Sequence, residues 1–315
     1  MNRSGSALSV GVKAARIHEY GGPEVIQYED VEKPSAGPGE VVLEVAAAGF
    51  NPADGGDRSG RFRSVRLPFT LGFDVAGTVD DVGEEVTTLA RGDRVIGRLD
   101  RGGASSEYAA VPAGVLASAP DSIPLPDAAA IPVAGLTAWQ AVHEHAHVLR
   151  GQRVVVSGAG GGVGGFTVQL ARQAGAHVIA TASARSAAAV RAQGADEIVD
   201  YTTTSLADAI QEPVDAVLSL VSVSRQAGRS LAELVRPEGV IVSITSEIEV
   251  PPDLGIRSAR FSARNDPEIL AELVRRIDAG DLTVDVAERR PLSELADVHR
   301  RSEAGEIRGK VVLIP

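Results

Sequence analysis

Short runs of β-branched and other apolar residues, separated by glycine, proline and aspartate, fill the beginning of the chain. The runs occupy residues 12–17, 25–31, 40–50, 75–82, 93–99 and 105–112. Turn-forming stretches such as "GGPE" and "PSAGPGE" lie between them. Many short strands with regular turn signals are typical of a barrel-like β domain, and this part of the chain therefore predicts one.

The pattern changes after residue 125. Residues 127–149 have a helical composition that Pro132 and Gly135 interrupt. Apolar strands then alternate with helices. The expected strands are 153–157, 177–181, 197–201, 214–220 and 239–244, and the expected helices are 163–175, 186–194 and 225–236. This alternation predicts parallel β-α-β units with helices on both faces of one sheet.

The last part of the chain predicts two more helices, at residues 266–280 and 292–305, and a final strand at 309–315. The pattern alone leaves two placements open. The segment either extends the parallel sheet or returns to the β domain.

Composition narrows the class of protein. A chain of 315 residues is long enough for two domains. Its net charge of −11 argues against nucleic acid or an anionic membrane surface as a partner. No apolar run is long enough to span a bilayer. Residues 1–11 lack the apolar core of a secretory signal, and we expect them to form a flexible tail. The absence of cysteine excludes disulfides and cysteine-containing zinc sites, and fits a cytoplasmic protein.

The stretch "GAGGGVGG" lies between the expected strand 153–157 and a helix. Two glycine frames fit it: Gly160-x-Gly162-x-x-Gly165 and Gly158-x-x-Gly161-x-x-Gly164. Either frame gives a tight turn, a close backbone approach to a pyrophosphate, and a helix N-terminus directed at the negative charge. The alternative is a flexible glycine linker, but the flanking strand and helix favour a dinucleotide site.

The end of the next strand indicates which dinucleotide binds. NAD sites place an acid there, whereas this chain has none from His177 to Ser186 and offers Ser183 and Arg185 instead. A guanidinium can pair with the 2′-phosphate of NADPH. The sequence therefore predicts NADPH over NADH, and the alternative interpretation of Arg185 is a solvated residue at a helix start.

Several stretches occur together in a fixed order: "LPFTLGFDVAGTV", "GLTAW", "GAGGGVG", "ATASAR", "GADEIVDY" and "GKVVLIP". With them the chain resembles, from about residue 12 to its end, the zinc-free quinone oxidoreductase branch of the medium-chain dehydrogenase/reductase superfamily. The resemblance implies an α/β protein with a GroES-like β-barrel substrate domain at 12–124, a doubly wound Rossmann domain for NADPH at 125–258, and a C-terminal return to the substrate domain at 259–315. It also implies a cleft between the domains and a homodimer built by the cofactor domains.

The resemblance carries roles onto single residues. The phosphate loop consists of Gly158, Gly160, Gly161, Gly162, Val163 and Gly164. The other positions that match cofactor-binding residues are Asn51 (facing nicotinamide and substrate), Thr137 (phosphates or nicotinamide), Ser183 and Arg185 (2′-phosphate), Tyr201 (adenosine end), Phe261, Arg264 and Lys310.

Metal-dependent relatives hold zinc through Cys and a His beside an acid. Here Phe73 precedes Asp74 and cysteine is absent, so the three protein ligands that zinc needs are missing. We expect Asp74 to hold a turn or to pair with a cation. The stretch "HEHAH" places His143 and His147 at i,i+4, a spacing that can bind zinc on a helix, but a solvated polar helix face is the expectation.

Without a metal Lewis acid, alcohol oxidation loses its alkoxide stabiliser, and quinones, enones and unsaturated thioesters become the favoured hydride acceptors. Several relatives place a Tyr after the Asn-x-x-Asp turn as a proton donor, where this chain has Gly55 and Gly56. These glycines suggest a wider pocket. The Asn51 amide can donate a hydrogen bond but cannot act as an acid. Asp54 and Asp57 can act as acids only if burial raises their pKa. The alternative is that these two aspartates cap turns.

The sequence leaves three alternative functions open. The first is an NADPH-dependent, metal-independent reductase of small-molecule quinones or α,β-unsaturated carbonyls, with Asn51 and Asp54 as catalytic candidates. The second is an enoyl reductase whose substrate arrives on a carrier protein, for which the four arginines of "RSGRFRSVR" (58–66) would supply a basic patch. The third is an NADPH-binding redox sensor without turnover.

Overall fold

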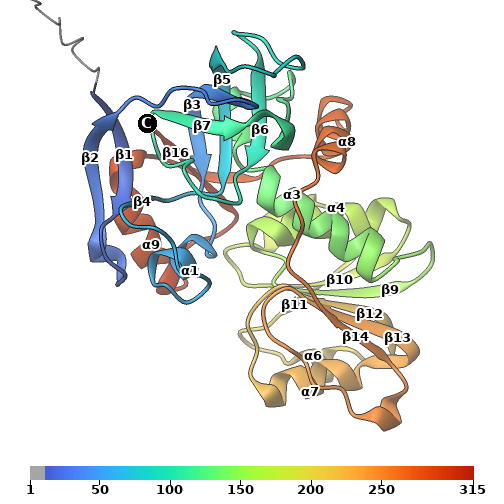
Figure 1. Ribbon diagram of the computed structural model, residues 1–315. Helices are drawn as coiled ribbons and strands as arrows, with labels where there is room; N and C mark the ends of the chain where they lie inside the picture. The colour runs from blue at the N-terminus through green and yellow to red at the C-terminus, as the bar shows by residue number, and fades with distance from the viewer. Residues whose placement is uncertain (1–10) are drawn as a thin grey trace, which may run out of the picture. The chain divides into compact units, whose positions relative to one another are not determined.

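The computed structural model describes residues 11–315 and divides into two compact units (Figure 1). The first unit runs to Ala129 and includes Glu288–Glu306 and Val311–Pro315. The second comprises Ala130–Ala287 and Ile307–Lys310. The sequence placed the divisions at 124/125 and 258/259, so the segment 259–287 lies in the second unit and not in the C-terminal return. The expected tail at 1–11 lies outside the described residues, apart from Gly11.

The first unit is built mainly of antiparallel strands. Its strands are β1 (Gly11–Ile17), β2 (Ile26–Glu32), β3 (Glu40–Gly49), β4 (Phe69–Thr70), β5 (Asp74–Val82), β6 (Arg94–Arg98), β7 (Tyr108–Pro112), β8 (Leu116–Ser118), β15 (Val286–Pro291) and β16 (Lys310–Ile314). They form a three-stranded sheet, β2-β1-β4, and a seven-stranded sheet, β15-β16-β3-β5-β6-β8 with β7 on β3. The runs that predicted strands are confirmed, and the fold is the expected GroES-like β domain.

The long strand β3 is the centre of the larger sheet. It pairs with β5 along one side and with β7 and β16 along the other. Val312 in β16 lies opposite Gly49, at the end of β3. The last strand of the chain therefore joins the β domain, which is one of the two placements that the pattern left open.

Short helices complete the first unit. They are α1 (Asp54–Arg58), α2 (Leu125–Ala128) and α9 (Leu295–Glu303), with 3-10 turns at Pro23–Val25, Ala113–Val115 and Leu292–Glu294. Helix α1 was not predicted, because two of its five residues are Gly55 and Gly56, which have poor helix propensity.

The second unit contains one parallel sheet with the strand order β11-β10-β9-β12-β13-β14. The strands are β9 (Arg153–Ser157), β10 (His177–Ala182), β11 (Glu197–Asp200), β12 (Val214–Ser219), β13 (Val235–Ser243) and β14 (Arg257–Arg260). The order reverses between β9 and β12, which is the switch point of a doubly wound sheet. The predicted Rossmann architecture is confirmed.

Helices cover both faces of this sheet, with α4 on one face and α6 and α7 on the other (Figure 1). The helices are α3 (Pro132–Trp139), α4 (Gly162–Gln173), α5 (Ala187–Ala192), α6 (Leu206–Ala209), α7 (Arg225–Glu233) and α8 (Pro267–Asp278), with a π-helix at Gln140–His145 and a 3-10 turn at Pro252–Leu254. Among residues 11–315, no helix is long and apolar enough to cross a membrane.

The core of the sheet consists of residues that face α6 and α7. Val155, Ile179, Val217 and Ile241 come from four adjacent strands and are fully buried. Such side chains contribute roughly 1.5–3 kcal/mol each to folding through burial. This apolar layer keeps the strands in register and so fixes the carboxyl ends at which the loops begin.

A buried polar cluster ties α1 to α9 within the first unit. The guanidinium of Arg58 lies 3.0 Å from Nδ1 of His299 and 2.5 Å from Glu303, and also donates to the Gly21 carbonyl at 3.1 Å. Both Arg58 and His299 are almost fully buried. Burial, together with the neighbouring Arg58 charge, lowers the pKa of His299 to about 3. His299 is therefore neutral and accepts the Arg58 hydrogen bond.

We expect this histidine to make the first unit sensitive to acid. Between pH 6.5, the ordinary His pKa, and about pH 3, the unfolded chain binds a proton that the folded chain does not. The free energy of unfolding should therefore fall with decreasing pH in this window, by up to about 1.4 kcal/mol per pH unit. Denaturant titrations at pH 6.5, 5.5 and 4.5 measure the slope.

The variant His299→Gln keeps an acceptor for Arg58 and removes the titrating group. Its stability should fall less steeply with acidification than that of the wild type, whereas the exposed His147→Gln should keep the wild-type slope. Equal slopes in His299→Gln and the wild type would contradict the prediction.

Candidate functional site

The glycine loop begins where β9 ends. Gly158 has φ +91°, a conformation that a side chain would strain, and turns the chain out of the strand. Its N–H donates to Oγ1 of Thr181, at the end of the neighbouring strand β10, at 2.9 Å. The N–H of Gly161 donates back to the Gly158 carbonyl at 3.2 Å. The loop is therefore a fixed turn and not a flexible linker.

Helix α4 starts directly after this turn. Gly161 is its N-cap and offers no side chain to the first turn. The first N–H groups of a helix have no partner inside the helix, so those of Gly162, Val163 and Gly164 point out of its end. A Cβ at Gly164 would lie 2.4 Å from the Gly158 carbonyl oxygen, which makes glycine obligatory there. These contacts match the frame Gly158-x-x-Gly161-x-x-Gly164, and the N–H donors fit a pyrophosphate.

The predicted 2′-phosphate and adenosine residues follow the adjacent parallel strands. Ser183 and Arg185 follow β10, and Tyr201, whose side chain is 59% exposed, follows β11. Because β9, β10 and β11 are parallel neighbours, their carboxyl ends share one edge of the sheet. The turn after β10 also packs on the loop, since a Cβ at Gly160 would meet Ser186 Oγ at 2.5 Å. The turn that carries Ser183 and Arg185 therefore lies against the glycine loop, and the roles of Ser183, Arg185 and Tyr201 stay predictions.

Lys310 approaches the same end of α4 from the C-terminal part of the chain. Its side chain is 4% exposed, and its Cδ would lie 2.5 Å from a Cβ at Gly162. The N–H of Gly309 donates to the Gly160 carbonyl at 3.0 Å, which fixes this segment on the loop. Lys310 therefore lies beside the first turn of α4, and its role in cofactor binding stays a prediction.

Phe261 and Arg264 lie elsewhere on the sheet. They follow β14, three strands from β9, which corresponds to roughly 14 Å at the usual strand spacing. The Arg264 guanidinium binds Glu144 and Asp266, and its backbone N–H and carbonyl are both bonded to the Gln140 side chain. The hydrogen bond from Arg264 lowers the pKa of Glu144. These contacts hold the segment on the π-helix.

Thr137 lies on α3 in the second unit. Its side chain is 7% exposed, and its hydroxyl donates to the Val133 carbonyl at 2.6 Å. The oxygen keeps its capacity to accept, so a ligand contact at Thr137 would use it as an acceptor.

In the first unit, the catalytic candidates Asn51 and Asp54 lie together at the start of α1. The backbone N–H of Asn51 donates to Oδ2 of Asp54 at 2.8 Å. The side-chain nitrogen of Asn51 donates to Oδ2 of Asp74 at 2.9 Å and to the Gly49 carbonyl at 3.2 Å. All three polar side chains are at most 5% exposed. Asp74, expected to hold a turn or a cation, thus binds the Asn51 amide.

The two glycines of α1 do not leave equal space. A Cβ at Gly56 would lie 2.3 Å from the ring of Phe62, whereas Gly55 has its nearest neighbours at 3.9 Å. The Phe62 ring is 66% exposed and covers Gly56. The suggestion of a wider pocket is therefore wrong at Gly56, because an aromatic ring from the following loop occupies that space.

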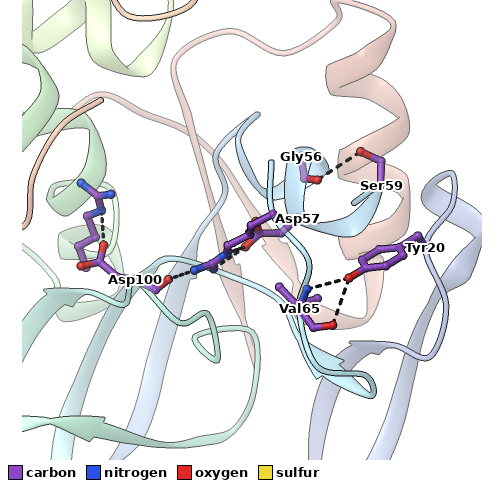
Figure 2. Close-up of polar contacts among 8 residues, drawn as sticks. Tyr20, Gly56, Asp57, Ser59, Val65 and Asp100 are labelled. Carbon is purple, nitrogen blue, oxygen red and sulfur yellow. Dashed lines mark hydrogen bonds and ion pairs between the residues drawn. The ribbon is translucent and has the colours of Figure 1, made fainter. Parts of the chain in front are cut away.

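The loop that carries Phe62 is tied down at both sides (Figure 2). Arg63 binds the carboxylate of Asp57 through two nitrogens and also donates to the Asp100 carbonyl. The hydroxyl of Tyr20 bonds the N–H and the carbonyl of Val65, at 2.7 and 3.1 Å. Asp57 is thus a partner of Arg63, and the loop has a fixed conformation.

These contacts also change the interpretation of the basic segment 58–66. Arg58 is buried against His299, and Arg63 is paired with Asp57. Only Arg61 and Arg66 of its four arginines are exposed. The segment presents a weaker basic surface than its composition suggests.

The three histidines of "HEHAH" point to different surroundings. His143 packs on the Trp139 ring at 4.5 Å between centroids, and His145 stacks on Phe261 at 4.0 Å. His147 is exposed beyond the π-helix. Burial lowers the pKa of His143. Within residues 11–315, no group of three or more His, Cys, Asp or Glu side chains is arranged to hold a metal ion.

Sequence reasoning missed residues that act through hydrogen bonds over a long sequence distance. Thr181 holds the glycine loop, and Gln140 holds the backbone of Arg264. A polar residue inside the apolar run "HVIATA" was the available signal for Thr181. For Gln140 the sequence gives no signal, because its partner lies 124 residues away.

Two family models match the chain. Residues 37–121 match the alcohol dehydrogenase GroES-like domain, and residues 193–313 match the zinc-binding dehydrogenase family. The second name describes the family, while this chain has no cysteine.

Relatives match over nearly the whole chain. A quinone oxidoreductase of Pseudomonas aeruginosa is 32% identical over 96% of this chain and 99% of its own length. A chloroplastic NADPH-dependent alkenal/one oxidoreductase of Arabidopsis thaliana is 30% identical over 96% of this chain and 80% of its own.

Solved structures of quinone oxidoreductases have the same fold as this chain. The quinone oxidoreductase from Coxiella burnetii superposes with a TM-score of 0.89 at 30% identity, covering 97% of this chain and 99% of that chain. The Escherichia coli quinone oxidoreductase complexed with NADPH superposes with a TM-score of 0.88 at 26% identity, covering 96% of this chain and all of that chain. The chain therefore belongs to the quinone oxidoreductase family of the medium-chain dehydrogenase/reductase superfamily.

Proposed function

We propose that this protein is an NADPH-dependent, metal-independent reductase of quinones or α,β-unsaturated carbonyl compounds. The observation that carries the proposal is the fixed glycine loop at the N-terminus of α4, next to a strand end that has Ser183 and Arg185 in place of an acid. The N–H groups of the loop bind the pyrophosphate, and Arg185 binds the 2′-phosphate. Names of relatives that act on quinones and on alkenals support the acceptor class.

We divide the cofactor residues into three sets by the part of NADPH that each would hold. Gly158, Gly160, Gly161, Gly162, Val163, Gly164 and Lys310 hold the phosphates, Ser183, Arg185 and Tyr201 hold the adenosine end, and Asn51 and Thr137 hold the nicotinamide end. For Phe261 and Arg264, which follow β14, the role in cofactor binding stays a prediction. When bound, NADPH supplies a hydride from its nicotinamide ring.

The acceptor class follows from what the chain lacks in sequence. With Phe73 before Asp74 and no cysteine, the chain has no ligand set for a Lewis-acid metal, so the acceptor must delocalise the charge that hydride adds. Quinones and conjugated carbonyls do so through their own oxygen. Asp54 accepts a hydrogen bond from the backbone N–H of Asn51, and we assign to Asp54 the role of holding Asn51 in place. The proton that the reduced acceptor takes up then comes from water.

A panel of acceptors tests this function. We expect the purified protein to oxidise NADPH with an ortho-quinone, a para-quinone or a simple enone, and to use NADH poorly, because only NADPH carries the phosphate for Arg185. Absorbance at the reduced-nicotinamide band measures the rate, and crotonyl thioester is included in parallel.

Each outcome separates the alternatives. Turnover with the thioester alone would favour the carrier-dependent enoyl reductase, although two of the four arginines that suggested it are used internally. Tight NADPH binding with no turnover on any acceptor would favour a redox sensor and would contradict the reductase proposal.

A single substitution tests the choice of cofactor. Arg185→Ala should weaken NADPH binding about tenfold or more and leave NADH binding unchanged, since a charge-assisted contact contributes about 1.5–3 kcal/mol. Titration of nucleotide fluorescence measures both dissociation constants. The matched control is Arg191→Ala, an exposed arginine on the next helix, α5. An equal loss for both nucleotides would exclude a 2′-phosphate contact.

We also propose a homodimer that works in the cytoplasm, where NADPH is kept reduced. Within the described residues, β14 ends the parallel sheet and pairs with β13 only. Such an edge is able to pair with a second copy. Sedimentation should give twice the chain mass of 32.6 kDa. A monomer mass at micromolar concentration would contradict the dimer.

A further inference from the structure

Few side chains of this protein can attack an electrophile. The chain has no cysteine and one methionine, Met1, which lies outside the described residues. Of its 31 lysines and arginines, only Lys13, Lys33 and Lys310 are lysines. A guanidinium stays protonated and is not a nucleophile. Residues 11–315 therefore offer three side-chain amines and no thiol.

All three lysines are paired or buried. Nζ of Lys13 lies 2.7 Å from the carboxylate of Asp30, and Nζ of Lys33 lies 2.6 Å from that of Asp80. The hydrogen bond that each ammonium donates raises the pKa of both lysines. The side chain of Lys310 is 4% exposed. Because only a neutral amine attacks, the two ion pairs and the burial of Lys310 keep these amines from reacting.

The imidazoles are the remaining nucleophiles, and five of the six are engaged or buried. They are His18 and His177, each beside a glutamate, His143 and His145, each packed on an aromatic ring, and the buried His299. His147 is exposed. A slow reaction with an electrophile should therefore begin at His147.

The chemistry of the proposed acceptors makes this pattern relevant. A thiolate or a neutral amine adds to the β-carbon of an enal or a quinone, and the electron pair of the double bond moves to the oxygen. The nucleophile gives up one proton and the enolate takes one up, so nothing is oxidised. At pH 7 roughly 3% of ordinary thiols are ionised, whereas about 0.04% of lysine amines are neutral. Thiols are thus alkylated first, and this chain has none.

We propose that the acceptors of this protein are electrophiles reactive enough to alkylate proteins, such as small enals and unsubstituted quinones, and that the chain reduces them without being alkylated. The inference rests on the proposed reductase function and narrows its acceptor class. An enzyme that meets an alkylating substrate at every turnover is modified at any reactive nucleophile that it exposes. An enoyl thioester alkylates weakly and imposes no such limit.

Covalent labelling without NADPH tests the resistance to alkylation. The purified protein is incubated with acrolein or para-benzoquinone, and adducts within residues 11–315 are mapped by mass spectrometry. We expect no lysine adduct at a dose that fully labels Ser230→Cys, which places one thiol at an exposed position of α7. Adducts that form at longer exposure should begin at His147 and be absent there in His147→Gln.

The protection of Lys33 by its ion pair has a matched test. Asp80→Asn removes the partner of Lys33 and should raise the labelling of Lys33 severalfold, because more of its amine is then neutral. Asp81→Asn removes the same charge at the adjacent, exposed position and should leave Lys33 as it is in the wild type. Equal labelling of Lys33 in both variants would contradict the protective role of the pair.

Turnover tests the acceptor class. With NADPH, acrolein or para-benzoquinone should be reduced at a steady rate until one reactant is consumed, and the recovered protein should keep its initial activity. Turnover accompanied by inactivation and lysine adducts would overturn this inference and leave the reductase function standing, as would reduction of crotonyl thioester alone. An unlabelled chain that reduces no acceptor would count against the reductase function itself.

Discussion

The second unit depends on how closely the first turn of α4 approaches the end of β9. A Cβ at Gly164 would lie 2.4 Å from the Gly158 carbonyl and 2.5 Å from that of Ala159, so a larger residue would separate helix and strand. The other contacts of the glycine loop require this short distance between the first turn of α4 and the end of β9. Thr181 reaches the Gly158 N–H, and Lys310 lies over Gly162 only because the turn is compact. One steric constraint thus sets the place of the N–H donors and of the residues around them.

The first unit uses a comparable device at the end of β3. Gly49 has the Ala129 carbonyl 2.1 Å and the Asp74 Cβ 2.8 Å from where its own Cβ would be. The missing side chain lets α2 and β5 close around the residue that precedes Phe50 and Asn51. In both units a strand therefore ends in glycine contacts that bring backbone and a polar side chain together. Buried apolar strands supply the rigidity, and the glycines supply the approach.

The sequence predicts the regular part of this architecture because periodicity reports burial on one or both faces. Most strands of the three sheets and the helices α4, α5, α7, α8 and α9 follow from it, whereas the short strands β4, β8, β14 and β15 do not. Elements that exist through contacts with distant residues do not. Helix α1 contains two glycines, and its Arg58 binds Glu303 on α9. The stretch of helical composition at 127–149 forms α2, α3 and a π-helix whose Gln140 binds the backbone of Arg264. The same limit applies to surface charge. The sequence shows four arginines in 58–66, but it does not show that two of them are paired inside the unit.

The pair Phe73-Asp74 shows what replaces a metal centre in this fold. In the zinc-dependent relatives an acid stands beside a histidine ligand, and the charge of the metal orders the site. Here a phenylalanine removes the ligand, but the acid remains and is fully buried. A buried carboxylate needs a donor, and the amide of Asn51 meets that need across 23 residues of sequence. The order that a cation would impose is thus supplied by an anion and an amide. The hydrogen bond between Asn51 and Asp74 therefore joins the segment after β3 to the start of β5.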